Sequence, residues 1–155
     1  FALQRGIDIA FIEEMPLGRI DEHDRALSFL SSEALRQIIA RQHTLEAAPE
    51  QRDAGGPARY YKTGGSQSRI GFISPHSQNF CHLCNRVRVT AEGRLLLCLG
   101  NEHSVDLRAV LRSSNYSRQL LKKTIVASLD IKPEKHHFNL TEPPQIVRFM
   151  NATGG

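Results

Sequence analysis

The sequence predicts an α+β fold, in which short paired strands alternate with a few short helices. Three observations predict it: an apolar, β-rich run at residues 6–12, two later pairs of β-rich runs separated by glycine, and two segments with apolar residues at helical spacing. At 155 residues, with 40% hydrophobic and 23% charged residues, the chain is long enough to bury a core of its own.

The first run, residues 6–12, is apolar almost without a break. It therefore reads as a strand buried on both faces, as in a parallel sheet or a barrel, and Pro16 and Gly18 end it. In parallel α/β folds, ligand contacts gather where strands end and loops begin. Glu13 and Glu14 stand at such a point, although loop carboxylates are more often simply solvated.

Local signals predict the remaining elements in order. Ser31 is expected to cap a helix that carries Leu35, Ile38 and Ile39 on one face. Further on, the sequence predicts a loop at 46–57, a hairpin of residues 59–62 and 69–73, a second hairpin in the cysteine segment, and helices at 104–112 and 117–129. The tail, residues 138–155, contains a Pro143–Pro144 break and ends in two glycines.

Composition excludes several classes of protein. The longest apolar stretches are far too short to span a membrane, and the first residues carry no signal-peptide pattern. The first residue is Phe1 rather than Met, so we expect the chain to be part of something longer. The net charge is only +4 and aromatic residues make up 6% without any Trp, which argues against nucleic-acid binding as the use of the basic surface.

The three cysteines of the chain form one candidate site. Cys81 and Cys84 make a Cys-x-x-Cys pair, and Cys98 follows at the end of the second predicted hairpin. An odd number of cysteines with this spacing argues against a disulfide framework and for reduced thiols, so we expect a cytoplasmic protein. Because a closed structural zinc site takes four protein ligands, three thiolates favour a metal centre with one open position.

The turn of the cysteine hairpin determines which side chains share a face. A three-residue loop at 91–93, with Gly93 in the left-handed conformation, pairs Arg88 with Leu96 and Arg86 with Cys98. Both arginines and Cys98 would then lie on one face, whereas a two-residue loop would turn Cys98 away from them. We favour the three-residue loop, which also brings Cys84 into the same row.

The spacing leaves the metal open between zinc and an iron–sulfur cluster. Zinc would need a fourth ligand, for which His76, His82 and His103 are candidates, and Cys-x-x-Cys spacing by itself slightly favours zinc. Three cysteines on a four-iron cluster would leave one iron free for an outside ligand.

The run Phe80-Cys81-x-x-Cys84-Asn85-Arg86-x-Arg88-x-Thr90-Ala91-x-Gly93, ending at Cys98-Leu99, closely resembles the C-terminal cluster motif of the GTP 3′,8-cyclase family. These are radical-SAM enzymes of molybdenum cofactor biosynthesis. Further similar stretches lie at residues 11–18, 56–61, 70–76 and 154–155, so the resemblance covers essentially the whole chain.

The resemblance implies a site. The three cysteines would hold a [4Fe-4S] cluster whose open iron takes the purine of GTP, and Arg86, Val87 and Arg88 would contact GTP. Met15 would contact S-adenosylmethionine, and the Gly154–Gly155 tail would reach into the active site. No residue of this chain is assigned a catalytic role.

The resemblance also implies a division of the chain. Residues 1–18 would be the last strand and loop of an incomplete, TIM-like radical-SAM barrel, and residues 19–155 the C-terminal [4Fe-4S]- and GTP-binding domain. The family's Cys-x-x-x-Cys-x-x-Cys motif, which holds the cluster that cleaves S-adenosylmethionine, is missing here. We therefore expect this chain alone to be inactive as an enzyme.

The intact protein is expected to convert GTP to (8S)-3′,8-cyclo-7,8-dihydroguanosine 5′-triphosphate, the first step of molybdenum cofactor biosynthesis. It would use S-adenosylmethionine and a second [4Fe-4S] cluster. Expected partners are GTP, a second copy of the protein in a possible homodimer, and cyclic pyranopterin monophosphate synthase as the next enzyme, with no membrane involved. The alternative is a zinc-binding structural or nucleic-acid-binding module.

Overall fold

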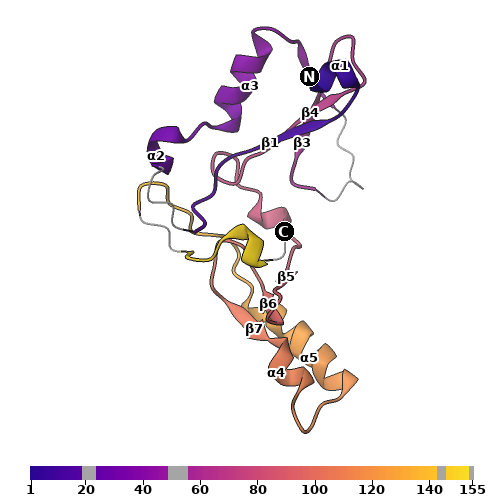
Figure 1. Ribbon diagram of the computed structural model, residues 1–155, viewed down its shortest axis with the longest axis vertical. Coiled ribbons are helices and arrows are strands. Elements are labelled where there is room, and N and C mark those ends of the chain that lie inside the picture. Colours follow the sequence, from indigo (N-terminus) through magenta and orange to yellow (C-terminus); the bar gives the residue numbers. More distant parts are fainter. Residues whose placement is uncertain (19–23, 49–55, 143–145, 154–155) are drawn as a thin grey trace. The chain divides into compact units, whose positions relative to one another are not determined.

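The computed structural model describes residues 1–18, 24–48, 56–142 and 146–153 (Figure 1). These residues form two compact units: the first contains residues 1–15, 24–48 and 56–80, and the second contains residues 16–18, 81–142 and 146–153. Strands and short helices alternate along the chain, which confirms the predicted α+β class. The domain boundary predicted after residue 18 stays a prediction.

The first unit is built on a four-stranded sheet with the strand order β1-β4-β3-β2. Its strands are β1 (Ile9–Ile12), β2 (Leu45–Ala47), β3 (Arg59–Thr63) and β4 (Arg69–Ile73). β1 runs parallel to β4, and the other neighbours are antiparallel. The β3–β4 pair confirms the predicted hairpin, and Gly65 adopts φ 78° in its turn.

Two expectations about this sheet need correction. β1 is not buried on both faces, because it is an edge strand of this sheet and leaves the side chains of Ile9 and Ile12 37% and 54% exposed. The predicted loop at 46–57 begins as strand instead, since β2 pairs with β3 through Leu45 and Thr63. Pairing with a neighbouring strand overrides the weak local preference of this segment.

The helices of the first unit are α1 (Ala2–Arg5), α2 (Arg25–Ser28) and α3 (Ser32–Ala40), and only α3 is predicted from the sequence. The hydroxyl of Ser31 accepts a hydrogen bond from the N–H of Ala34 at 3.2 Å, which confirms the predicted cap. The core of the sheet forms around the ring of Phe72, whose centroid lies 6.0 Å from that of Phe11 and 5.7 Å from that of Tyr61.

The second unit contains a three-stranded sheet with the order β5-β6-β7 and two helices. Its elements are η1 (Cys81–Leu83), β5 (Arg88–Val89), β6 (Arg94–Leu96), β7 (Ser104–Asp106), α4 (Leu107–Leu111), α5 (Arg118–Ser128), η2 (Leu129–Ile131) and η3 (Met150–Thr153), where η marks a 3₁₀ turn. Leu95, Leu97 and Leu107 form its buried core, and Val105 and Leu121 pack against it. Leu121 thereby joins α5 to the cysteine hairpin.

The helix predicted at 104–112 is wrong in its first three residues. Ser104 to Asp106 form β7, which pairs with β6, and α4 begins only at Leu107. Asp106 ends the strand and caps the helix, since its carboxylate accepts a hydrogen bond from the N–H of Ala109 at 2.8 Å. The helix predicted at 117–129 is confirmed as α5, with Ser117 as its cap.

The C-terminal segment is held to the rest of the second unit by backbone and side-chain contacts. Ile146 forms a parallel bridge with Leu17, and the N–H of Gly18 donates to the carbonyl of Ile146 at 2.8 Å. The guanidinium of Arg148 donates to the carbonyls of Leu99 and Asn101 and pairs with Glu102. The predicted Pro143–Pro144 break lies outside the described residues.

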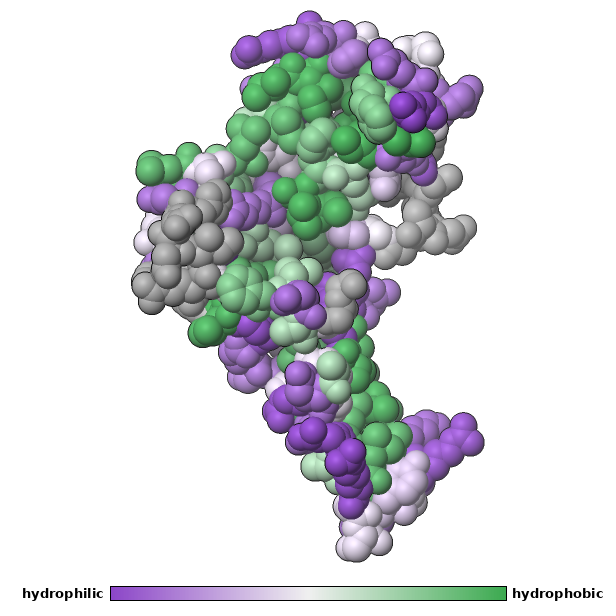
Figure 2. Space-filling view, in the orientation of Figure 1, coloured by the Kyte–Doolittle hydropathy of each residue, from purple (hydrophilic) through white to green (hydrophobic). Residues whose placement is uncertain are grey.

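Several apolar side chains lie at the surface among polar ones, and Figure 2 shows both kinds on its visible face. Examples are Ile12 in β1, 54% exposed, and Val126 in α5, 58% exposed. None of the helices in the described ranges combines the length and the apolar character that a membrane crossing needs.

Candidate metal and substrate site on the cysteine hairpin

Two of the three cysteines lie on one tight turn. Cys81 begins η1, and the N–H of Cys84 donates to the carbonyl of Cys81 at 3.0 Å, so the Cys-x-x-Cys segment folds back on itself. All three cysteines are half-buried free thiols in this structure. Free thiols in this arrangement are suited to binding a metal.

The hairpin that follows has the register of the three-residue loop. Arg88 pairs with Leu96, Val89 pairs with Leu95, and the N–H of Thr90 donates to the carbonyl of Arg94 at 2.9 Å. Gly93 has φ 80°, the left-handed conformation that such a loop requires. Both features are confirmed as predicted. The same register, if it continued two residues beyond the last pair of the ladder, would set Arg86 opposite Cys98, and this pairing stays a prediction.

Side-chain exposure alternates along residues 84–89, the segment that leads into β5. Cys84, Arg86 and Arg88 are half-buried, whereas Val87 and Val89 are 41% and 56% exposed. A period of two is the pattern that the predicted row requires, but only Arg88 and Val89 belong to β5, so the row stays a prediction. Val87, the third predicted GTP contact, directly precedes β5 and is exposed.

The electrostatic surroundings of Cys98 reflect its neighbours. Burial raises the pKa of the Cys98 thiol, and the nearby Cys81 and Cys84 thiols raise it further, while a hydrogen bond from the N–H of Gly100 and the positive charge of Lys132 lower it. A bound metal would reverse the balance, because it holds thiolates deprotonated.

The donor chemistry of the site fits an iron–sulfur cluster. Clusters are held by cysteine thiolates, and hydrogen bonds to the sulfurs tune them, as the Gly100 N–H does for Cys98. A Cβ on Gly100 would meet the ring of Phe138 and the Cβ of His136 at 2.7 Å, so the packing of this residue depends on glycine. Across the described ranges, no three His, Cys, Asp or Glu side chains are grouped as ligands of a metal ion.

The three histidines considered as a fourth zinc ligand are in different places. His82 and His103 are exposed residues of the second unit. His76 belongs to the first unit, where its Nε2 lies 2.9 Å from the carbonyl oxygen of Glu14.

The other predicted site residues are not part of the hairpin. Met15, the predicted contact to S-adenosylmethionine, belongs to the first unit and is half-buried. The predicted active-site tail, Gly154 and Gly155, lies outside the described residues.

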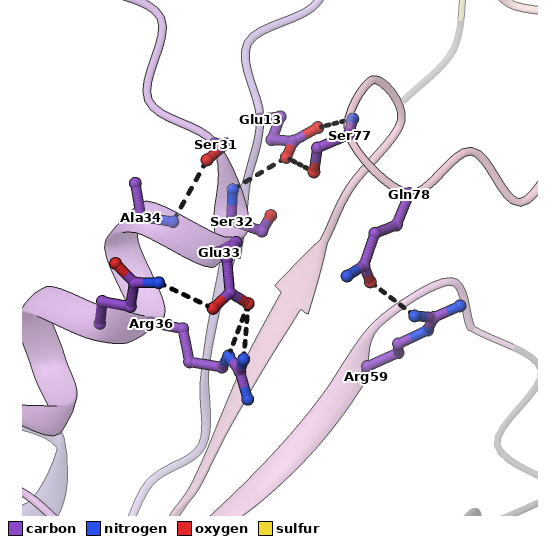
Figure 3. A network of polar contacts seen from close by, with 10 residues as sticks. Glu13, Ser31, Ser32, Glu33, Ala34, Arg36, Arg59, Ser77 and Gln78 are labelled. Carbon is purple, nitrogen blue, oxygen red and sulfur yellow. Dashed lines mark hydrogen bonds and ion pairs between the residues drawn. The ribbon is translucent and has the colours of Figure 1, made fainter.

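Glu13 is a buried structural anchor rather than a solvated loop carboxylate (Figure 3). Only 2% exposed, it accepts hydrogen bonds from the N–H of Ser32 at 2.8 Å, from the N–H of His76 at 2.9 Å, and from both the N–H and the hydroxyl of Ser77. It thus ties the end of β1 to the start of α3 and to the loop after β4. Glu14 forms an ion pair with Arg25 at 3.0 Å.

Sequence reasoning overlooked two cationic side chains, Lys132 and Arg148, that bind the segments around Cys98 in the second unit. Lys132 donates to the carbonyls of Arg86 and Leu97, and Arg148 binds the loop directly after Cys98. Their partners are 35 to 49 residues away in the chain. No local pattern signals such contacts, because they are made by backbone carbonyls that every residue carries.

Comparisons with known proteins agree with the resemblance. Residues 7–138 match the family model described as Molybdenum Cofactor Synthesis C. The chain is 60% identical to a GTP 3′,8-cyclase of Marinobacter nauticus and 58% identical to one of Saccharophagus degradans, each over 155 residues. It is 54% identical to GTP 3′,8-cyclase 2 of Pseudomonas aeruginosa.

All of this chain is covered in these matches, but only 46% of each relative, so the chain spans about half the length of the curated relatives it matches. The family model covers most of the chain, including the cysteine hairpin on which the resemblance was recognised. The chain belongs to the Molybdenum Cofactor Synthesis C family.

Proposed function

We propose that this chain is the C-terminal, substrate-binding part of a GTP 3′,8-cyclase. The intact protein would convert GTP to (8S)-3′,8-cyclo-7,8-dihydroguanosine 5′-triphosphate in the first step of molybdenum cofactor biosynthesis. The names of the relatives at 54–60% identity and the family match support this proposal. Because the chain spans 46% of these relatives, the reaction needs parts of the protein beyond it.

The observation that carries the proposal is the row of side chains on the cysteine hairpin. The alternating exposure of residues 84–89 and the Arg88–Leu96 register support a row in which Cys84, Arg86 and Arg88 would share one face and Cys98 would lie opposite Arg86. Cys81, Cys84 and Cys98 would hold a [4Fe-4S] cluster, which supplies an open iron site for the purine. The guanidiniums beside it would bind the triphosphate, since arginine pairs with phosphate oxygens in a bidentate manner.

The rest of the assembly follows from the same proposal. Met15 would contact S-adenosylmethionine at the end of the barrel strand, and Gly154 and Gly155 would enter the active site. S-adenosylmethionine and the second [4Fe-4S] cluster would be bound by the remainder of the intact protein. A homodimer, a cytoplasmic location and delivery of the product to cyclic pyranopterin monophosphate synthase complete the proposal.

Substitution of Arg88 by Met tests the substrate-binding role. In the anaerobically reconstituted chain, we expect Arg88→Met to weaken GTP binding about tenfold to a hundredfold, because a charge-assisted contact to phosphate is lost. Arg112→Met removes the same charge from the exposed C-cap of α4 in the same unit and should leave binding unchanged. Isothermal titration under nitrogen measures both variants.

Equal GTP affinity in the Arg88 and Arg112 variants would remove the arginine row from the substrate site. The alternative function, a zinc-binding module, predicts a colourless protein that binds one zinc ion and shows no spectral change with GTP.

A further inference from the structure

The ladder of the cysteine hairpin ends before it reaches the cysteines. Its outermost pair is Arg88 and Leu96, while Cys84 and Cys98 lie four and two residues further out. Strand ends that lack ladder hydrogen bonds separate readily. A site that needs both cysteines at a fixed separation therefore requires some other connection between the two segments.

Lys132 supplies that connection. Its ammonium donates to the carbonyl oxygen of Leu97 at 2.5 Å and to that of Arg86 at 3.2 Å, one from each segment of the hairpin. Leu97 directly precedes Cys98, and Arg86 follows Cys84 by two residues. Each carbonyl thus lies within two residues of a cysteine, just outside the last ladder pair.

The position of Lys132 is itself fixed by the fold. It follows η2, which continues from α5, and its own N–H donates to the carbonyl of Leu129 at 3.1 Å. α5 in turn packs on the hairpin core through Leu121. The half-buried side chain gives up rotamer freedom, which its two charge-assisted hydrogen bonds offset.

We propose that Lys132 is a positioning residue that clamps the open end of the cysteine hairpin and holds together the two segments that carry Cys84 and Cys98, as cluster binding requires. This inference deepens the proposed function and rests on it for the identity of the metal group. The clamp itself is a property of the polypeptide and exists without the cluster. Lys132 acts through backbone carbonyls and is not proposed to touch GTP.

The first test measures the clamp without metal. In the metal-free chain, Lys132→Met should accelerate amide hydrogen exchange at Arg88 and Leu96 about tenfold, because the end of the ladder opens more often. Lys123→Met removes the same charge from an exposed position on α5 and should leave these amides unchanged. Amides of β3 and β4 serve as an internal standard in both variants.

The second test measures the consequence for the cluster. After anaerobic reconstitution, Lys132→Met should lose iron to a chelator several times faster than the unmodified chain and show a broadened or shifted electron paramagnetic resonance signal once reduced. Lys132→Arg, which keeps the charge and can still donate to two carbonyls, should restore most of both properties. Circular dichroism verifies that each variant remains folded.

The outcomes separate this inference from the proposed function. Unchanged exchange at the hairpin end in Lys132→Met overturns the clamp, whatever metal the protein binds. Accelerated exchange in a chain that takes up no iron supports the clamp and rejects the cluster. If amide exchange in Lys132→Met is faster but iron retention and the electron paramagnetic resonance signal are unaltered, the clamp does not position the cysteines and the proposal is overturned.

Discussion

At the scale of single residues, Glu13 shows how a buried charge can be stabilising. Burial works to raise its pKa, but hydrogen bonds from Ser32, Ser77 and His76 outweigh this effect and hold the pKa below its usual value. The carboxylate therefore prefers the folded state, where its acceptors are satisfied. Its role is to join three segments of the first unit rather than to act on a substrate.

Replacement of Glu13 by Gln should lower stability in a pH-dependent way. Since the folded pKa lies below the unfolded value of about 4.5, the carboxylate contributes its stability above that pH and loses it as the pH falls through the folded pKa. We expect Glu13→Gln to reduce the free energy of unfolding by about 1–3 kcal/mol at pH 7, and by clearly less below pH 4.

Urea denaturation of the metal-free chain at several pH values measures this difference. Glu46→Gln, on the exposed side of β2, is the matched control and should change little at any pH. If Glu13→Gln lowered the free energy of unfolding by the same amount at pH 7 and below pH 4, the carboxylate charge would contribute nothing to stability.

At the scale of elements, the cysteine hairpin depends on its turn. Gly93 has φ 80°, and a Cβ there would approach the Cβ of Arg108 to 2.9 Å. Its carbonyl also accepts hydrogen bonds from the N–H groups of Leu107 and Arg108, at 3.0 and 3.2 Å. The turn therefore fixes both the register of the hairpin and the start of α4.

Substitution of Gly93 by Ala should destabilise the second unit by about 2–4 kcal/mol, through left-handed strain and the close contact with Arg108. Gly64→Ala is the control, because its added Cβ would meet no atom within 4 Å. Thermal unfolding followed by circular dichroism measures both variants. Equal midpoints for the two would mean that the turn does not constrain the hairpin.

The elements also show what a sequence can and cannot predict. The hairpin register was predictable because Gly93 and a period of two are local signals. The helix start at residue 104 was not, since Ser104 to Asp106 become strand only by pairing with β6. The roles of Lys132, Arg148 and Glu13 depend on contacts between distant segments, which local patterns do not encode.

At the scale of the whole molecule, the chain consists of two compact units and spans about half the length of its relatives. In the first unit, β1 is an edge strand of the sheet and exposes Ile9 and Ile12. The second unit carries the cysteine hairpin. The predicted radical-SAM barrel stays a proposal. In that proposal, β1 would gain further strand neighbours in the intact protein.

The central claim is that three cysteines of this chain hold a four-iron cluster with one open iron site. The most direct measurement is anaerobic reconstitution followed by iron and sulfide analysis and Mössbauer spectroscopy, with and without GTP. We expect about four irons and four sulfides per chain, with one iron whose signal changes when GTP binds, and loss of the cluster in Cys98→Ala. A colourless protein that holds a single zinc ion through the same three cysteines would contradict it.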